Sequence, residues 1–389
     1  MPESKLDYEA LVSSKSLNDT AKLTVTDDGL TVAALFTPVF IGFADITGIG
    51  RAGNAVVVST DYDTFAFDRL GNLADAFYGE VYDAFNARVS KAFFREGAPV
   101  FQTHGDFHYA EADAQASGHA VITVYDDCLC LLPPDDTARR VPFAFVDGLR
   151  SQAFDLTLTV DGRDSYDFAR LGRDTDPFVA CVKERLHRFR ENSVNAVRAL
   201  DGTLNPAQLT AIATRMPEGV AVAMGELASV APSYAAALEA KIAESRAAET
   251  YAALKTICDP ATICVGMKSG LAGEQAEDIL WFIAPSSVRP MAAVEFAVDE
   301  DTAAATFVYN MPGDQAEFVR RLNRAMEAIV FHREVISMPD DELSRTENAA
   351  YAMAVKRTSS LRFIRDSLAG RVIHTSLEAW TSGIRGYLA

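Results

Sequence analysis

The sequence is short of positive charge. Lysine and arginine total 36 against 54 aspartates and glutamates, so the formal net charge is −18. Negative charge of this size repels phosphate backbones and anionic lipid headgroups at long range. We therefore expect no nucleic-acid partner and no stable membrane association.

Long hydrophobic runs are also missing, and cysteines are few. The longest nearly uncharged stretch, between Asp28 and Asp45, is interrupted by Pro38 and Gly42 and is shorter than the roughly 20 residues of a membrane-spanning helix. Residues 1–14 mix charged and apolar residues and lack the basic start and apolar run of a signal peptide. Five cysteines, an odd number, then favour reduced thiols in a cytoplasmic protein.

Hydrophobic residues, by contrast, are plentiful, at 49% of the 389 residues with 10% aromatics. A chain of this length should fold into about two to four units of about 100 to 200 residues each. We predict an α+β chain of five segments: two similar β-rich units at 1–97 and 98–200, a helical segment at 201–258, a four-strand-plus-helix unit at 259–335, and a helical tail at 336–389.

The two β-rich units repeat one another in sequence. Three short motifs recur in the same order at spacings of 99, 100 and 101 residues. They are Asp27-Asp28-Gly29-Leu30 with Asp126-Asp127-Cys128-Leu129, Ile41-Gly42-Phe43-Ala44 with Val141-Pro142-Phe143-Ala144, and Arg69-Leu70-Gly71 with Arg170-Leu171-Gly172. A spacing that drifts by only two residues indicates an internal duplication with short loop insertions.

In each copy, alternating apolar residues predict strands, and helical spacing follows the third motif. The expected strands lie at 39–46, 55–59 and 64–67 in the first copy, and at 140–146, 156–160 and 165–168 in the second. A hairpin around the Asp-Asp turn precedes them in each copy. The expected helices carry Leu73, Phe77, Val81 and Phe85, and Phe178, Val182 and Leu186.

An antiparallel meander closed by one C-terminal amphipathic helix resembles the pleckstrin-homology-like superfold. The pattern is similar to that of bacterial proteins of unknown function, and it covers about residues 20–95 and 100–190. The resemblance implies two tandem sheet platforms. Functions on such a platform range from lipid headgroup binding to protein docking, so the fold alone does not choose between them.

The second half continues with strands and helices. Strands are expected at 263–267, 279–284, 292–298 and 304–309, followed by a helix at about 314–331, which leaves open a divergent third β module. In the tail, an apolar stripe with Leu361 lies beside several arginines. We interpret this basic helix as a solvated flank or an intramolecular partner of acidic surface, in preference to a nucleic-acid contact.

One glycine-rich motif suggests a cofactor. Gly48-Ile49-Gly50-Arg51-Ala52-Gly53 has the spacing of a dinucleotide-binding fingerprint, and that site needs a helix next, whose N-terminus meets the pyrophosphate. Residues 55–58 instead predict a strand. We therefore interpret the motif as a glycine-rich β turn and expect no cofactor.

Two sets of residues are candidate metal ligands. His104, Asp106 and His108 alternate, so on a strand they share one face, and their side chains suit zinc or manganese. No fourth ligand is evident, and alternating polar residues are typical of the solvent face of a strand. Cys128 and Cys130 also share a face, but their apolar neighbours favour a packing role. A metal-binding protein or enzyme that uses this histidine strand or the second half is the alternative function.

No assembled catalytic site emerges from the sequence. A nucleophile elbow, a Walker loop and a metalloprotease motif are missing. Glu295, Asp299 and Glu300 form a carboxylate cluster at a strand end beside a turn, which is typical of solvated side chains. We therefore assign no catalytic residue and lean toward a protein that is not an enzyme.

Candidate partner-binding residues lie on the two equivalent hairpins. The first copy's hairpin is apolar and includes Phe36 and Phe40, which mark a contact surface or, as the simpler interpretation, burial against the second copy. Arg139 and Arg140 lie where phosphoinositide-binding members of the superfold place basic residues, so lipid headgroup binding is a second alternative. The duplication without assembled chemistry favours a non-catalytic adaptor or scaffold whose sheet edges dock a protein or peptide.

Overall fold

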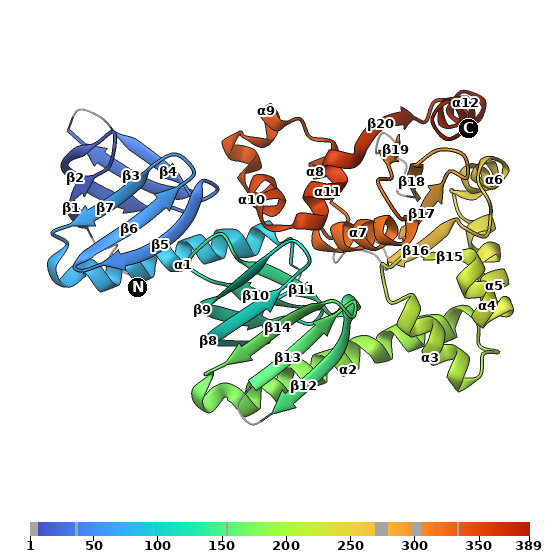
Figure 1. Ribbon diagram of the computed structural model, residues 1–389, viewed down its shortest axis with the longest axis horizontal. Coiled ribbons are helices and arrows are strands. Elements are labelled where there is room, and N and C mark those ends of the chain that lie inside the picture. The colour runs from blue at the N-terminus through green and yellow to red at the C-terminus, as the bar shows by residue number, and fades with distance from the viewer. Residues whose placement is uncertain are drawn as a thin grey trace. The chain divides into compact units, whose positions relative to one another are not determined.

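Over the residues that it describes, the structure, a computed structural model, combines helices with three antiparallel sheets (Figure 1). It describes residues 7–35, 38–95, 97–152, 155–268, 279–297, 305–332 and 334–389. The chain divides into two units, of which the first contains Met1–Cys181 and Met338–Ser359, and the second contains Val182–Ser337 and Ser360–Ala389. The α+β class is confirmed. None of the helices in the described ranges combines the length and the apolar character needed to cross a membrane.

The first copy is a seven-stranded sheet followed by a helix. The strand order is β4-β3-β2-β1-β7-β6-β5. The strands are β1 (Tyr8–Ser13), β2 (Asn18–Val25), β3 (Gly29–Ala34), β4 (Val39–Gly42), β5 (Ile46–Ala52), β6 (Ala55–Thr60) and β7 (Thr64–Asp68). A 3₁₀ turn, η1 (Gly71–Leu73), leads into α1 (Ala74–Ala92). Phe77, Val81 and Phe85 of α1 are buried at four-residue steps, as their spacing predicts.

The second copy has the equivalent elements. Its strand order is β11-β10-β9-β8-β14-β13-β12. The strands are β8 (Phe101–Ala110), β9 (Gln115–Val124), β10 (Cys128–Leu132), β11 (Arg139–Pro142), β12 (Val146–Gln152), β13 (Asp155–Val160) and β14 (Asp164–Ala169). The 3₁₀ turns η2 (Phe143–Phe145) and η3 (Gly172–Asp174) precede β12 and α2 (Thr175–Leu200), respectively.

Local geometry repeats along with the topology, which confirms that the two segments are copies of one structure. The β5-β6 pairing of the first copy has a register shift at Ile46/Gly48, and the equivalent β12-β13 pairing of the second copy has the same shift at Val146/Gly148. Arg69 and Arg170 have left-handed φ angles of 63° and 54°. Such angles are uncommon for residues with a side chain, so their recurrence at equivalent positions shows that the Arg-Leu-Gly motif specifies the turn into the helix.

Two features of the first copy differ from the expectation. The sequence pattern placed the start of the copy near residue 20, but β1 (residues 8–13) lies in the middle of the sheet, with Tyr8 and Val12 buried. The glycine motif is also not a turn as a whole. Gly48 and Gly50 lie within β5, and only Gly53, with φ of 61°, lies in the turn to β6. A strand and not a helix follows, so the dinucleotide geometry is excluded at this motif.

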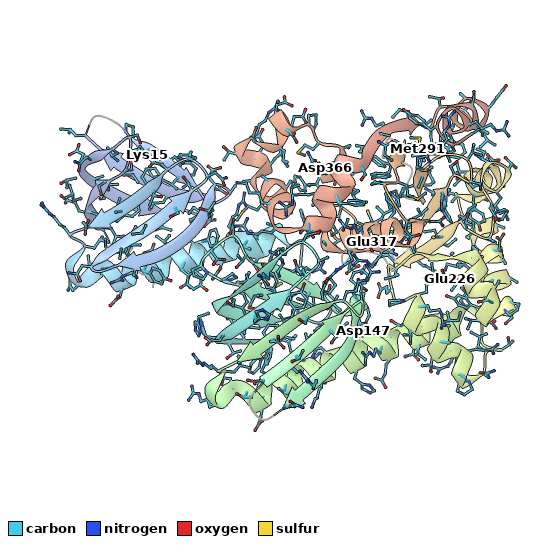
Figure 2. The ribbon with its side chains drawn as sticks, in the orientation of Figure 1. Lys15, Asp147, Glu226, Met291, Glu317 and Asp366 are labelled. Carbon is cyan, nitrogen blue, oxygen red and sulfur yellow. The ribbon has the colours of Figure 1, made fainter. Side chains whose placement is uncertain are left out.

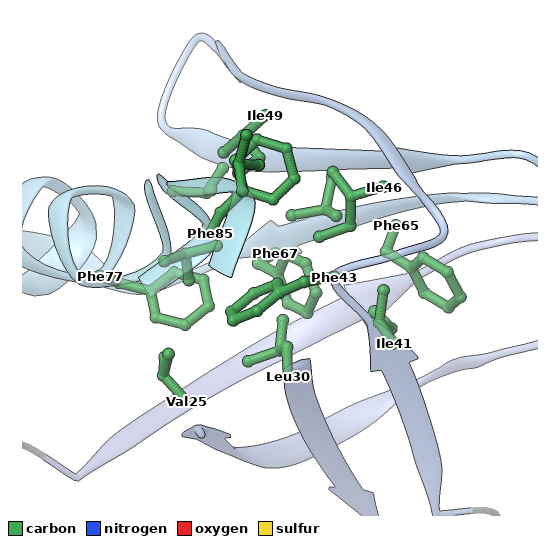
Figure 3. Packing of buried hydrophobic residues seen from close by; sticks show 14 of the residues in the cluster. Val25, Leu30, Ile41, Phe43, Ile46, Ile49, Phe65, Phe67, Phe77 and Phe85 are labelled. Carbon is green, nitrogen blue, oxygen red and sulfur yellow. The ribbon is translucent and has the colours of Figure 1, made fainter. Parts of the chain in front are cut away.

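The core of the first copy extends into the second. Figure 3 shows Phe43, Phe67, Phe77 and Phe85 gathered between the sheet and α1. The same cluster contains Cys128 and other buried residues of the second copy's sheet. On this side, Tyr82 of α1 donates a 2.7 Å hydrogen bond to the Leu132 carbonyl oxygen. Helix α1 is therefore packed between its own sheet and the β10 region of the second sheet.

The second unit contains a six-stranded sheet in the order β15-β16-β17-β18-β19-β20. The strands are β15 (Val222–Ala223), β16 (Cys264–Lys268), β17 (Ile279–Pro285), β18 (Met291–Ala297), β19 (Ala305–Asn310) and β20 (Leu368–Ile373). The helices of this part of the chain are α3 (Pro206–Arg215), α4 (Met224–Val230), α5 (Pro232–Glu244), α6 (Ala248–Ile257), α7 (Gln315–Ala328), α8 (Glu334–Ser337), α11 (Ser359–Ser367) and α12 (Leu377–Leu388). Glu317 of α7, labelled in Figure 2, accepts hydrogen bonds from Arg320 Nη2 at 2.7 Å and Arg321 Nε at 2.8 Å.

The third sheet is not a divergent copy of the first two. Its strands follow one another as a simple meander, whereas the first strand of each duplicated sheet lies in the middle and pairs with the last. The expected all-helical tail is also wrong in one place, because residues 368–373 form β20 and pair with β19. Alternating exposure along β20 shows why the helical pattern ends there.

Candidate docking groove

An exposed aromatic ring marks the edge of the first sheet. In the β3-β4 pair, Gly29 lies opposite Gly42 and Thr31 lies opposite Phe40. A Cβ atom on Gly29 would lie 2.7 Å from Phe40 Cζ, so the ring lies over the position that a side chain would fill. An aromatic side chain beside a strand glycine covers the backbone that the glycine leaves bare. The residue nevertheless remains 48% exposed.

A cavity of about 370 Å³ lies beside this ring. One wall comes from the first copy and contains Asp28, Phe40, Gly42, Ala44 and Asp45. The other wall comes from residues 338–359, which we call the C-terminal insert because the chain returns to the first unit there. The insert contains α9 (Asp340–Leu343), η4 (Thr346–Asn348) and α10 (Ala349–Arg357). Its lining residues are Asp340, Leu343, Ser344, Arg345, Thr346, Ala349, Ala352, Val355 and Lys356.

The insert is held on the first copy by mixed contacts. Met353 is completely buried in the shared core. Tyr351 stacks on Phe94 with ring centroids 5.5 Å apart. Lys356 Nζ donates a 2.8 Å hydrogen bond to the Ala44 carbonyl oxygen and also pairs with Asp61. These contacts join α10 to both the end of α1 and the loop that follows β4, so they fix the width of the cavity.

The backbone of β4 offers hydrogen-bonding groups at this edge. Phe43 N donates to the Asp28 carbonyl oxygen at 2.9 Å, on the side of β3. Because backbone groups alternate between the two sides of a strand, the N–H and C=O of Phe40 point away from β3. Within the described ranges, β4 is the last strand on its side of the sheet. An extended segment could therefore pair there and place a side chain against the ring of Phe40.

The four partner-binding candidates fare differently. Phe40 is not buried against the second copy, so that interpretation is wrong for this residue, while Phe36 lies outside the described residues. Arg139 Nε contacts both carboxylate oxygens of Glu111, at 3.0 and 3.1 Å, and its guanidinium lies over the Tyr109 ring. The Arg140 side chain is 2% exposed, and its Nη2 lies 2.7 Å from Asp127. Both arginines thus have carboxylate partners inside the protein, which weakens the basis for a lipid headgroup site.

The histidine strand lies on the solvent side of the second sheet. Along β8, His104 and His108 are exposed and Asp106 is half-buried, so the three side chains share a face as predicted. The Asp106 carboxylate makes a 2.9 Å contact with His119 Nδ1 and a 3.0 Å ion pair with Arg170. The hydrogen bond from His119 lowers the pKa of Asp106. In the parts of the chain that the structure describes, no three His, Cys, Asp or Glu side chains are grouped to hold a metal ion.

The paired cysteines of β10 are packing residues. Cys128 and Cys130 are both completely buried, and both belong to the core cluster that the two copies share. Burial raises the pKa of the Cys128 thiol well above its usual range, so the thiol stays protonated and poorly reactive. All five cysteines are free thiols.

A buried polar network in the second unit was missed by the sequence analysis. Glu295 is 3% exposed, so the expectation of a solvated carboxylate is wrong for this residue, while Asp299 and Glu300 lie outside the described ranges. His374 Nε2 lies 2.9 Å from Glu295 Oε2 and 3.2 Å from Thr306 Oγ1, and Trp380 Nε1 donates to Thr306 Oγ1 at 2.6 Å. Thr306 Oγ1 also donates a hydrogen bond to Glu295 Oε2.

The geometry of this network does not fit nucleophilic catalysis. A base that activates a hydroxyl uses one ring nitrogen for the hydroxyl and the other for the orienting carboxylate. Here a single nitrogen, His374 Nε2, contacts both groups, and Thr306 is completely buried. The network instead satisfies buried polar groups where β18, β19, β20 and α12 meet.

The comparisons with known proteins add no family to this description. No protein-family model matches the chain, and no curated protein matches it.

Proposed function

We propose that the chain is a non-catalytic cytoplasmic adaptor that docks an extended protein segment along β4, and that each seven-stranded unit is a pleckstrin-homology-like module. The observation that carries the proposal is the cavity beside an edge strand with a half-exposed aromatic ring. Strand addition uses backbone hydrogen bonds for affinity and a pocket for specificity, and both are present at β4. The five free thiols are consistent with a reducing compartment.

The lining residues define the chemistry of the docked segment. Phe40, Leu343 and Val355 offer apolar surface for an aliphatic or aromatic side chain. The charged lining residues are Asp28, Asp45, Asp340, Arg345 and Lys356, three acidic and two basic, so the rim is net negative. Lys356 pairs with Asp61, and Asp28 pairs with Arg88 at 3.2 Å. We therefore propose a segment in which a basic residue flanks the apolar one, which also suits the net charge of −18.

A displayed library of random peptides provides the test, because the natural partner is not needed. The library is selected on the full-length chain and counter-selected on the Phe40→Ser variant. We expect enriched peptides that combine an apolar and a basic residue and that bind the variant at least about tenfold more weakly, a difference of about 1.4 kcal/mol.

The matched control is Val100→Ser, which also removes an exposed apolar side chain, 40% exposed in the wild type, but does not line the cavity. Circular dichroism and the melting temperature establish that both variants are folded. Peptides that bind the Phe40→Ser variant as tightly as the wild type, or that lose affinity equally in Val100→Ser, would refute docking at β4.

A further inference from the structure

The contact that holds the C-terminal insert contains a buried arginine. Arg357, the last residue of α10, is 2% exposed. Within the described residues, its Nε, Nη1 and Nη2 atoms have no hydrogen-bond acceptor. Its guanidinium lies over the Phe85 ring, 5.6 Å from the centroid. A cation-π contact recovers only part of the hydration free energy that a guanidinium loses when it is buried.

Charged groups around Arg357 reduce the free-energy cost of burying its guanidinium but do not cancel it. Asp136, Asp135 and Asp61 attract the guanidinium from the surrounding elements, and Arg139 repels it. Burial is the larger influence and lowers the pKa of Arg357 to about 10. The docked insert is therefore stabilised by Met353, Tyr351 and Lys356 and is opposed by Arg357. Because the contributions have opposite signs, the docked state is less stable than its favourable contacts alone would make it.

The same segment supplies most of the residues that line the cavity, so the groove is complete only when the insert is docked. We propose that the C-terminal insert is a releasable wall of the docking groove, so that binding of a peptide and docking of the insert favour one another. This inference rests on the proposed function. The coupling follows from linkage, since a ligand that needs both walls binds only the docked state and raises its population.

Hydrogen exchange of the full-length chain, without any peptide, tests the first half of the inference. Arg357→Met keeps an unbranched side chain that matches the arginine as far as Nε, and it removes the charge and the unpaired donors. We expect the amides of 349–357 to exchange at least about threefold more slowly in this variant, and more quickly in Lys356→Ala, which loses the contacts to Ala44 and Asp61. The matched control is Arg140→Met, in which a buried but carboxylate-paired arginine is removed, and faster exchange near β11 is expected.

Peptides from the library selection test the second half. Their affinity should rise at least about threefold in Arg357→Met and fall by a similar factor in Lys356→Ala. Faster or unchanged exchange of the insert in Arg357→Met would overturn the releasable wall whatever the peptides do. Changed exchange with unchanged affinity in both variants would overturn the coupling. A library without Phe40-dependent binders would instead remove the proposed function, and the exchange result would still decide whether the insert releases.

Discussion

The two copies have the same backbone at their edge hairpins and different residues on it. Gly29 pairs with Gly42 and Thr31 with Phe40 in the first copy, whereas Cys128 pairs with Pro142 and Cys130 with Arg140 in the second. The turn hydrogen bonds are also equivalent, from Phe43 N to Asp28 O and from Phe143 N to Asp127 O. The difference in surface therefore comes from side chains and not from the fold.

The residue differences between β4 and β11 have opposite consequences for the pairing of an added strand with each edge. In β11 the outward-facing backbone groups are those of Arg140 and Pro142, and proline has no N–H to donate. A proline at this position blunts the edge against an added strand. In β4 the equivalent residue is Gly42, and Phe40 remains half-exposed. Of these two equivalent strands, β4 therefore keeps an outward backbone N–H that β11 lacks, which is the basis of the docking proposal. The second copy's sheet packs against the first copy's helix.

The largest expected effect contrasts Arg140 with Phe40. Arg140→Ala removes a nearly buried partner of Asp127 and should destabilise the first unit by about 2 to 3 kcal/mol. Phe40→Ala should cost less than about 1 kcal/mol, because much of the ring is already exposed. Urea denaturation followed by far-ultraviolet circular dichroism measures both.

An internal control is available for this comparison. Trp281 and Trp380 are the two tryptophans of the chain, and both belong to the second unit. Their fluorescence transition should stay unchanged in both variants. Equal losses of stability in Arg140→Ala and Phe40→Ala would mean that the two edges do not differ in the way described.

A smaller effect is expected from the glycine under the aromatic ring. A Cβ atom at Gly29 would lie 2.3 Å from the Ile41 carbonyl oxygen, so Gly29→Ala must move the strand pair and should cost about 2 kcal/mol. Gly48→Ala is the matched control in the same sheet, because nothing lies within 4 Å of its Cβ position. We expect that variant to stay within about 0.5 kcal/mol of the wild type. A neutral Gly29→Ala would show that Phe40 is not positioned by this glycine.

The duplication could be predicted because local physics encodes it. The Asp-Asp turns, the Arg-Leu-Gly motifs and the helical spacing of Phe77 and Phe85 each depend on neighbouring residues. Strand β1 was missed because its side chains alternate over only six residues next to a charged start. Gly48 and Gly50 of β5 were predicted to lie in a turn because glycine is typical of turns. A strand also accommodates glycine, and nothing lies within 4 Å of the Cβ position of either residue.

Only one wall of the groove could be predicted from the sequence. Phe40 was named from its apolar hairpin, but the sequence does not show whether the second copy covers it. The opposite wall comes from residues such as Leu343 and Val355, about three hundred positions further along the chain. No local sequence pattern predicts that the chain returns to the first unit at these residues, since an amphipathic helix such as α10 packs equally well on many surfaces. The His374 network was missed for the same reason, because strand pairing brings its members together.

The most direct test of the difference between the edges is amide hydrogen exchange with a library-selected peptide present and absent. We predict that the peptide slows exchange in β4 (residues 39–42) and leaves β11 (residues 139–142) unchanged. Slower exchange in β11, or equal protection of both strands, would contradict the proposal that an extended segment docks on β4 and not on the equivalent strand β11.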